Sequence, residues 1–316
     1  MQSLMIPRLS HALARLALAC IACLVPLVAL AAPAASTATQ APQRAFSTPD
    51  DAVHALVAAV RAANDVAMAR ILGPGSVKLI RSGDPVADRH SRERFLEAYD
   101  QQSRIDVDGD AKATLFVGEK EWPFPFPIVH RASGWQFDLR SGAEEILNRR
   151  IGRNELAAIQ VCLAYVDAQR EYALSAGNAE GMHAYAMRLV SRPGRKDGLY
   201  WPVHEGEPAS PLGPLASKAK EEGYRAQPYQ GYYYRILTRQ GASAPGGAYD
   251  YVVDGKMIGG FALVAYPARW GASGVMTFIV NHDGIVYQKN LGPKTTAIAS
   301  AMTRFDPDPG WARVEP

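Results

Sequence analysis

The longest helical pattern in the chain runs from Gly142 to Ala176, between two parts of the sequence that are rich in strand and turn signals. Apolar residues recur within it at intervals of three and four, which predicts one buried face. These residues are Leu156, Ile159, Leu163 and Val166. Gly152 interrupts the pattern, and a glycine inside a helix costs roughly 1 kcal/mol relative to alanine. We therefore expect at Gly152 either a kink or a change from the packing of one domain to that of the next.

The first 31 residues have the pattern of a secretory signal peptide. Arg8 and Arg15 form a short basic region, residues 16–30 are apolar, and Ala29 and Ala31 fit a small-x-small cleavage site. The apolar run is too short to span a bilayer, and Pro26 interrupts it. We expect cleavage near Ala31 and a periplasmic or secreted mature chain without a transmembrane segment.

The charge balance argues against binding through bulk electrostatics. The chain has 34 Lys and Arg against 31 Asp and Glu, and loss of Arg8 and Arg15 leaves 32 against 31, a net charge of +1. We therefore expect no nucleic-acid partner. Only Cys162 of the three cysteines remains after cleavage, which excludes an intramolecular disulfide. The core must depend on packing alone, and 48% hydrophobic residues suffice for that.

Residues 46–141 predict a first domain, after a disordered Ala/Pro/Ser/Thr-rich lead-in at residues 32–45. Thr48 and Pro49 are typical of the start of a helix, and further helices are expected from Asp65 and Ser91. The period then becomes two, which predicts strands at residues 111–117, 126–130 and 135–139. Helices on one side of a curved antiparallel sheet make an α+β layer. This order of elements resembles the cone-shaped nuclear-transport-factor-2-like fold.

Residues 142–316 predict a second domain, made of the long helix and an antiparallel meander. A short helix from Leu215 to Glu222 is stopped by Gly223. Strands are expected at residues 231–238, 248–253, 260–266, 275–280 and 285–288, followed by a helix at residues 295–304. Turn pairs such as Asp254-Gly255 and Asp283-Gly284 occur at the spacing that hairpins need. The fold class is therefore α+β with two domains.

Two family resemblances follow from these residues. NRRIGRNELAAIQVCLAYVDAQREYA, GYYYRIL and SGVMTFIVNHDGIVYQKNLG look like the secreted bacterial family catalogued as domain of unknown function 2950, from Phe46 to the end of the chain. That resemblance implies an envelope protein of Gram-negative bacteria, and it implies no activity and no functional residues. The C-terminal half is also similar to the globular part of type IV pilin-like proteins and pseudopilins. Pilins have an apolar polymerising helix before this part, whereas this chain has a whole domain there.

No catalytic constellation emerges from the sequence, which contains no HExxH, GxSxG, phosphate-loop or mature CxxC motif. Cys162 lies in mid-helix among apolar residues, so we interpret it as a core residue. His282-Asp283-Gly284 fits a hairpin turn better than a metal or acid–base site. Residues 106–110 alternate carboxylates but lack the distal glutamate of a calcium loop, which favours a polar turn. We expect no metal and no cofactor.

Arg149, Arg150 and Arg153 form the one basic cluster in the long helix. They fit solvated partners of neighbouring carboxylates, and they also fit a bidentate clamp for a carboxylate or phosphate at the domain junction. The sequence does not decide between these two hypotheses.

Six tyrosines gather in what we expect to be two neighbouring strands of the meander, at positions 229, 232, 233, 234, 249 and 251. Successive strand residues face opposite sides, so we expect Tyr233 and Arg235 to face away from the long helix. Tyrosine and arginine favour binding surfaces, although tyrosines also simply tile antiparallel sheets. We predict an envelope protein or polymer as the partner of this surface.

These patterns favour a non-catalytic envelope binding or assembly module. The alternative is a hydrolase-like periplasmic enzyme that uses a pocket enclosed by the N-terminal cone. A buried cluster of titratable side chains in that cavity would favour the enzyme, and an apolar or open cavity would favour binding.

Overall fold

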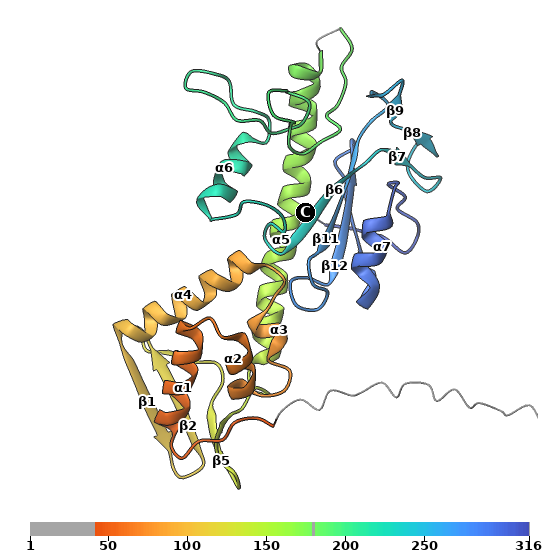
Figure 1. The fold of residues 1–316 in the computed structure, drawn as a ribbon. Helices are drawn as coiled ribbons and strands as arrows, with labels where there is room; N and C mark the ends of the chain where they lie inside the picture. Colours follow the sequence, from red (N-terminus) through yellow and green to blue (C-terminus); the bar gives the residue numbers. More distant parts are fainter. Residues whose placement is uncertain (1–41, 179–180, 316) are drawn as a thin grey trace, which may run out of the picture. The chain divides into compact units, whose positions relative to one another are not determined.

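The computed structural model describes residues 42–178 and 181–315 in a mixed fold of helices and antiparallel sheets (Figure 1). The expected signal peptide and residues 32–41 of the lead-in lie outside the described residues. Residues 42–45, also expected in the lead-in, already belong to the fold, because the Gln43 amide donates to the carbonyl oxygens of Ile71 (3.1 Å), Leu72 (3.2 Å) and Phe137 (2.8 Å). Within the described ranges, no helix has the length and apolar character needed to cross a membrane.

Four helices open the first lobe, which we define as residues 42–141. They are α1 (Pro49–Arg61), α2 (Asp65–Leu72), α3 (Val77–Ile80) and α4 (Pro85–Gln101). The Thr48 side chain caps α1 by accepting from the Asp51 N–H at 3.1 Å, as its position predicted. The start of α4 was predicted at Ser91, which is six residues too late. This helix begins at Pro85, because Asp84 caps its N-terminus.

The sheet of the first lobe is antiparallel and has strand order β1-β2-β4-β5, with β3 paired to β2. Its strands are β1 (Ser103–Asp108), β2 (Lys112–Val117), β3 (Trp122–Pro123), β4 (Ile128–Arg131) and β5 (Gly134–Phe137). Leu56 of α1 packs in the first core with Leu115, Ile128 and Phe137 of the sheet. The carboxylate-rich segment at residues 106–110 spans the end of β1 and its turn into β2, as expected.

Helix α5 (Ala143–Leu174) continues through Gly152 without interruption. Ile146 packs against the first core, whereas Ala158 and the buried residues after it belong to the second core. Gly152 therefore lies between the two packing environments, and a methyl group added there would meet no atom within 4 Å.

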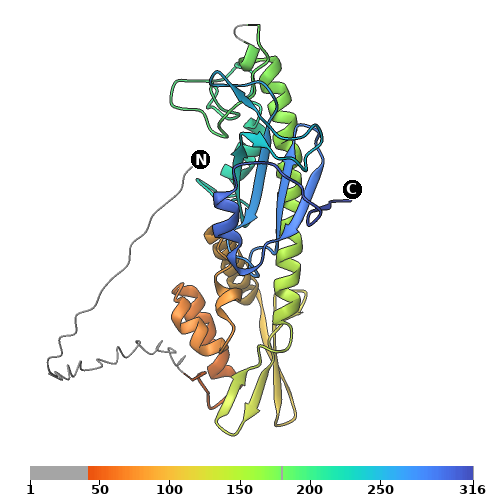
Figure 2. The same cartoon turned by 90° about the vertical axis from the view of Figure 1, so that its right-hand side faces the viewer.

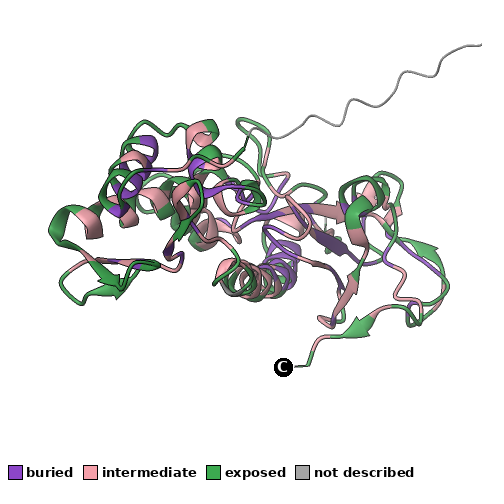
Figure 3. Ribbon diagram, turned by 90° about the horizontal axis from the view of Figure 1, so that it is seen from below, coloured by how far each residue is buried: buried purple, intermediate pink, exposed green. Residues whose placement is uncertain are grey.

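The buried face of α5 differs from the one expected. Leu156 is 66% exposed and Leu163 is 37% exposed, so assigning them to the core was wrong. The buried stripe instead has intervals of four and three and includes Ala158, Cys162, Tyr165, Gln169 and Tyr172. Of the four expected residues, Val166 is buried and Ile159 packs against the second core. Small residues in this stripe let the helix approach the sheet closely, and Figure 3 shows the buried residues on one side of α5. Cys162 is fully buried, which confirms its place in the core and raises the pKa of its thiol to about 12.

The second lobe, residues 142–315, contains a five-stranded antiparallel sheet of order β14-β13-β12-β11-β6. Its strands are β6 (Tyr232–Leu237), β11 (Ala262–Pro267), β12 (Met276–Asn281), β13 (Val286–Asn290) and β14 (Ala312–Arg313). Helix α5 packs on one face, and α7 (Thr295–Ala301) contacts β11 from the side that carries Arg235 (Figures 1 and 2). The second core includes Tyr232, Leu263 and Phe278.

Shorter elements connect these strands. They are α6 (Gly213–Glu221), β7 (Arg239–Gln240), β8 (Tyr249–Asp250), β9 (Val252–Val253), β10 (Lys256–Met257) and two short 3-10 helices, Ala176–Asn178 and Gly292–Lys294. Gly223 follows α6 with φ +88°, the left-handed conformation expected of a stop signal. Because β8 pairs with β7 and β6 pairs with β11, Tyr249 is not on a strand next to β6. The expectation of two neighbouring tyrosine strands was wrong.

Both edges of the five-stranded sheet offer few unpaired backbone N–H and C=O groups to another strand. At the β6 edge, the Gln227 side chain accepts from the Tyr234 N–H at 2.6 Å and donates to its carbonyl oxygen at 3.1 Å. At the opposite edge, β14 is only two residues long. Such devices limit the surface on which another strand could pair.

Replacement of Gly152 by alanine is expected to stabilise the protein by about 0.5–1 kcal/mol, because the added methyl group meets open space and alanine is the better helix former. Urea unfolding measures the change. A loss of stability would show that the helix bends at Gly152 in solution.

A fragment that starts at Gly142 is expected to fold without the first lobe, because its core cluster is built from residues of the second lobe. Cooperative thermal unfolding with retained near-ultraviolet circular dichroism would support this expectation. An aggregating fragment without a cooperative transition would contradict it.

Candidate functional site

Asp84 joins the two lobes through a fully buried carboxylate. Its Oδ1 accepts from the N–H groups of Val86 (3.1 Å) and Ala87 (3.0 Å) and so caps α4. Its Oδ2 accepts from the Tyr224 hydroxyl at 2.8 Å and from the Gly231 N–H at 2.7 Å, both in the second lobe. Burial and the neighbouring Asp84 carboxylate raise the pKa of Tyr224, so this phenol stays a hydrogen-bond donor.

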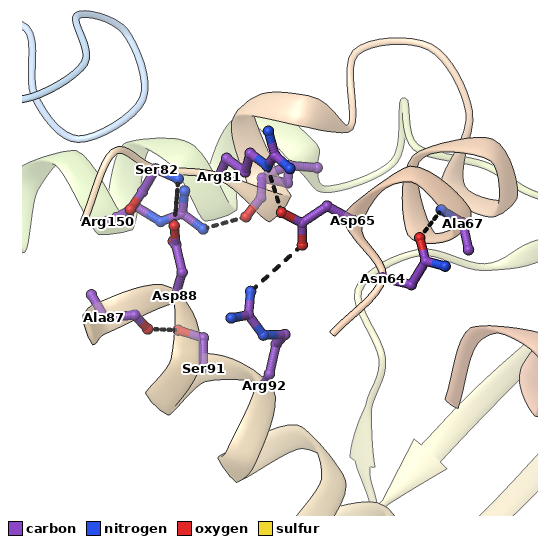
Figure 4. A network of polar contacts seen from close by, with 11 residues as sticks. Asn64, Asp65, Ala67, Arg81, Ser82, Ala87, Asp88, Ser91, Arg92 and Arg150 are labelled. Carbon is purple, nitrogen blue, oxygen red and sulfur yellow. Dashed lines mark hydrogen bonds and ion pairs between the residues drawn. The ribbon is translucent and has the colours of Figure 1, made fainter. Parts of the chain in front are cut away.

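One turn further along α4, Asp88 faces Arg150 of α5. The two carboxylate oxygens of Asp88 accept from the Ser82 N–H at 3.2 and 3.0 Å (Figure 4). Burial raises the pKa of Asp88, while the Ser82 hydrogen bonds and the charge of Arg150 act in the opposite direction. Asp88 is partly buried, whereas the other carboxylates of α4 are exposed.

Arg150 holds α3 against α5. Its guanidinium donates to the carbonyl oxygens of Lys78 (2.9 Å) and Leu79 (2.8 Å), which lie in the single turn of α3. Burial lowers the pKa of Arg150, and the charge of Asp88 opposes this effect. An arginine has five N–H donors, so Arg150 retains donors for a ligand beyond these two bonds.

A polar pocket of about 290 Å³ opens at this junction. Residues of α4, α5 and the segment after α6 line it, and its charged members are Asp88, Arg94, Arg150, Arg153 and Glu222. Gln230 donates to Glu222 at 2.9 Å, which satisfies part of that carboxylate. Arg94 contacts the Ser91 hydroxyl at 3.3 Å and, within the described ranges, has no ion pair with a carboxylate. The pocket therefore offers arginine donors to an anion.

An apolar cavity of about 410 Å³ lies next to the polar pocket in the first lobe. Its walls come from α1, α2, α3, α4, the sheet and the start of α5, and they include Leu56, Val60, Met68, Phe95, Val117 and Phe124. Phe95 and Phe124 pack with their ring centroids 5.2 Å apart. The cavity and the polar pocket share four residues, which are Asp88, Ser91, Arg94 and Arg150. A ligand with an apolar body and an anionic group fits this combination.

The predicted arginine cluster is divided by the structure. Arg150 and Arg153 both line the polar pocket, whereas Arg149 is not among its lining residues. Successive residues of an α-helix point about 100° apart, so Arg149 points away from Arg150, and the direction of Arg153 lies between the two. Whether these arginines bind a ligand remains a prediction.

Tyr233 and Arg235 lie elsewhere, on the face of β6 opposite Tyr234. The Arg235 guanidinium donates to the carbonyl oxygen of Ala299 at 2.9 Å and also to that of Met302, at the end of α7. Tyr233 packs on Tyr266 with the ring centroids 5.6 Å apart. Arg235 therefore caps α7, and its replacement would disturb the fold as well as any partner surface. Partner binding through Tyr233 and Arg235 remains a prediction.

Several residues of the site were missed by the sequence analysis. Asp84-Pro85 is a recognisable N-cap with proline at the first helical position, and it was the available signal for the true start of α4. Asp88, Arg94 and Glu222 carry no local signal, because only tertiary contacts between α4, α5 and the segment after α6 bring them together.

The chemistry open to the site is limited by its side chains. Within residues 42–178 and 181–315, no group of three or more His, Cys, Asp or Glu is placed to hold a metal ion. The hydroxyl of Ser91 donates to the Ala87 carbonyl oxygen at 2.9 Å and so is not directed at a base. His282 and Asp283 follow β12 in the turn to β13, as the hairpin interpretation predicted.

Comparison with known families identifies the chain. The family described as Protein of unknown function (DUF2950) matches residues 43–314. The chain belongs to this family. Comparisons with curated proteins and with solved structures gave no match. In this DUF2950 protein, the match spans both lobes, including Asp84, the polar pocket and the apolar cavity.

Replacement of Asp84 by asparagine is expected to destabilise the DUF2950 protein by about 2–3 kcal/mol. Asparagine can still cap α4, but its amide group would face the N–H of Gly231 or the hydroxyl of Tyr224 and leave a buried donor unpaired. Urea unfolding measures this loss. The exposed Asp108→Asn serves as the control, and an Asp84→Asn effect as small as that of the control would contradict the proposed junction.

Proposed function

We propose that this DUF2950 protein is an exported envelope protein that binds a ligand or partner without transforming it. The junction of α4 and α5 is the proposed binding site, with Arg150 and Arg153 as the predicted ligand donors and Arg94 added to them. The observation that carries the proposal is the apolar cavity that shares Arg94 and Arg150 with a polar pocket. Apolar walls with a few convergent polar groups are typical of small-molecule sites.

The proposed location is the periplasm or the exterior of a Gram-negative cell. It depends on the signal-peptide pattern at residues 1–31. The finer likenesses belong to the same proposal: a cone of the nuclear-transport-factor-2 type in the first lobe, and a pilin-like second lobe joined to it through α5. An assembly role with another envelope protein or polymer, through Tyr233, is the related proposal for the second lobe.

The cavity favours binding over the hydrolase-like alternative. Its lining is mainly apolar, and its acidic member, Asp88, is held by the Ser82 N–H. Ser91, the hydroxyl of the cavity, is bonded to a backbone carbonyl rather than to a general base.

Native mass spectrometry of the mature protein purified from periplasm tests the proposal. A small anionic ligand is expected to co-purify, and Arg153→Glu is expected to lower its affinity about tenfold or more, because a charge-assisted contact becomes a repulsion. Arg195→Glu is the matched control, since Arg195 is exposed in a loop and lines neither cavity.

Two results would contradict this function. A ligand that binds equally well to the wild type and to Arg153→Glu would lie elsewhere on the protein. Chemical conversion of the recovered ligand during incubation with the protein would identify an enzyme instead of a binding module.

A further inference from the structure

A second, separate groove of about 690 Å³ lies in the second lobe. Its floor is formed by Val161 and Tyr165 of α5, Tyr234 of β6 and Leu263 of β11. The groove has Tyr224 in common with the polar junction pocket and none of the arginines of that pocket. It is therefore distinct from the site proposed above.

Helix α6 forms one wall of the groove. Leu215, Ala216 and Ala219 line it, and their spacing places them on one helical face. The two alanines leave the space between α6 and α5 unfilled. Lys218 is exposed and is not among the lining residues.

The charged residues that line the groove are both basic. Lys220 lies in the last turn of α6 and Arg225 lies in the segment that follows the helix, and no acidic residue is among the lining residues of this groove. Both side chains are exposed, and among the described residues neither forms an ion pair with a carboxylate. The nearby Glu222 belongs instead to the junction pocket, where Gln230 donates to it.

We propose that this groove binds a single-chain anionic amphiphile, a free fatty-acid carboxylate or a molecule of the same chemistry. The alkyl chain lies between α5 and α6 against Val161 and Leu215, and the carboxylate meets Lys220 and Arg225. The volume falls within the range of roughly 300–1,000 Å³ that is usual for small-molecule sites. Two unpaired cations at one end of an apolar groove match the two parts of such a molecule.

Calorimetric titration of the mature protein with monomeric dodecanoate tests the proposal. Dodecanoate is expected to bind at least about tenfold more tightly than dodecyltrimethylammonium, because only the carboxylate is attracted by the two cations. Affinity is also expected to rise from octanoate to dodecanoate, by up to roughly fourfold for each buried methylene.

Variants locate the ligand. The double variant Lys220→Glu and Arg225→Glu is expected to weaken dodecanoate binding about tenfold or more. Lys218→Glu is expected to leave it unchanged, because Lys218 does not line the groove. Ala216→Phe fills the groove and is expected to abolish binding. Ala219→Leu gives a second, milder filling variant if Ala216→Phe does not fold.

Three outcomes would overturn the proposal. One is equal binding of the cationic and anionic amphiphiles. Another is dodecanoate binding that survives the filling variants but is lost in Arg94→Glu, which would place the ligand in the first lobe. The third is binding to phosphatidylglycerol vesicles without binding of the monomer, which would identify a membrane surface.

Discussion

A single buried carboxylate connects the parts of this protein on which its proposed site depends. Asp84 starts α4 through Oδ1 and holds Tyr224 and Gly231 of the second lobe through Oδ2. The same helix carries Asp88 and Arg94 into the junction pocket. A buried carboxylate is tolerated only when its oxygens are hydrogen-bonded. The geometry of the pocket and the stability of the junction therefore both depend on the hydrogen bonds of Asp84.

The local parts of the fold could be predicted from the sequence. The capping of α1 by Thr48, the extent of α5 and the end of α6 before Gly223 each depend on residues close together in the chain. The buried face of α5 could not be predicted from hydrophobicity alone. Leu156 is exposed, while Gln169 is buried because its amide bonds the Tyr165 hydroxyl and the Ala186 backbone. Such a polar core residue depends on partners that are distant in the chain.

The sequence also could not predict which strands lie next to each other in the sheet. The sequence predicts most strands of the second lobe, but it does not state that β6 pairs with β11 across residues 238–261, the segment that contains β7 to β10. For the candidate site, Arg150 and Arg153 were predicted as a basic pair on α5. Their carboxylate neighbours Asp88 and Glu222 were not, because these residues meet the arginines only after the lobes have packed.

The Gln227 side chain determines where the second sheet ends. A primary amide carries one donor group and one acceptor, as a peptide bond does. The Gln227 amide bonds the N–H and the carbonyl oxygen of Tyr234, the two groups that a neighbouring strand would otherwise bond. The sheet is thus terminated by a side chain, without the need for a sixth strand. Such a stop favours remaining a separate molecule over growth into an intermolecular sheet.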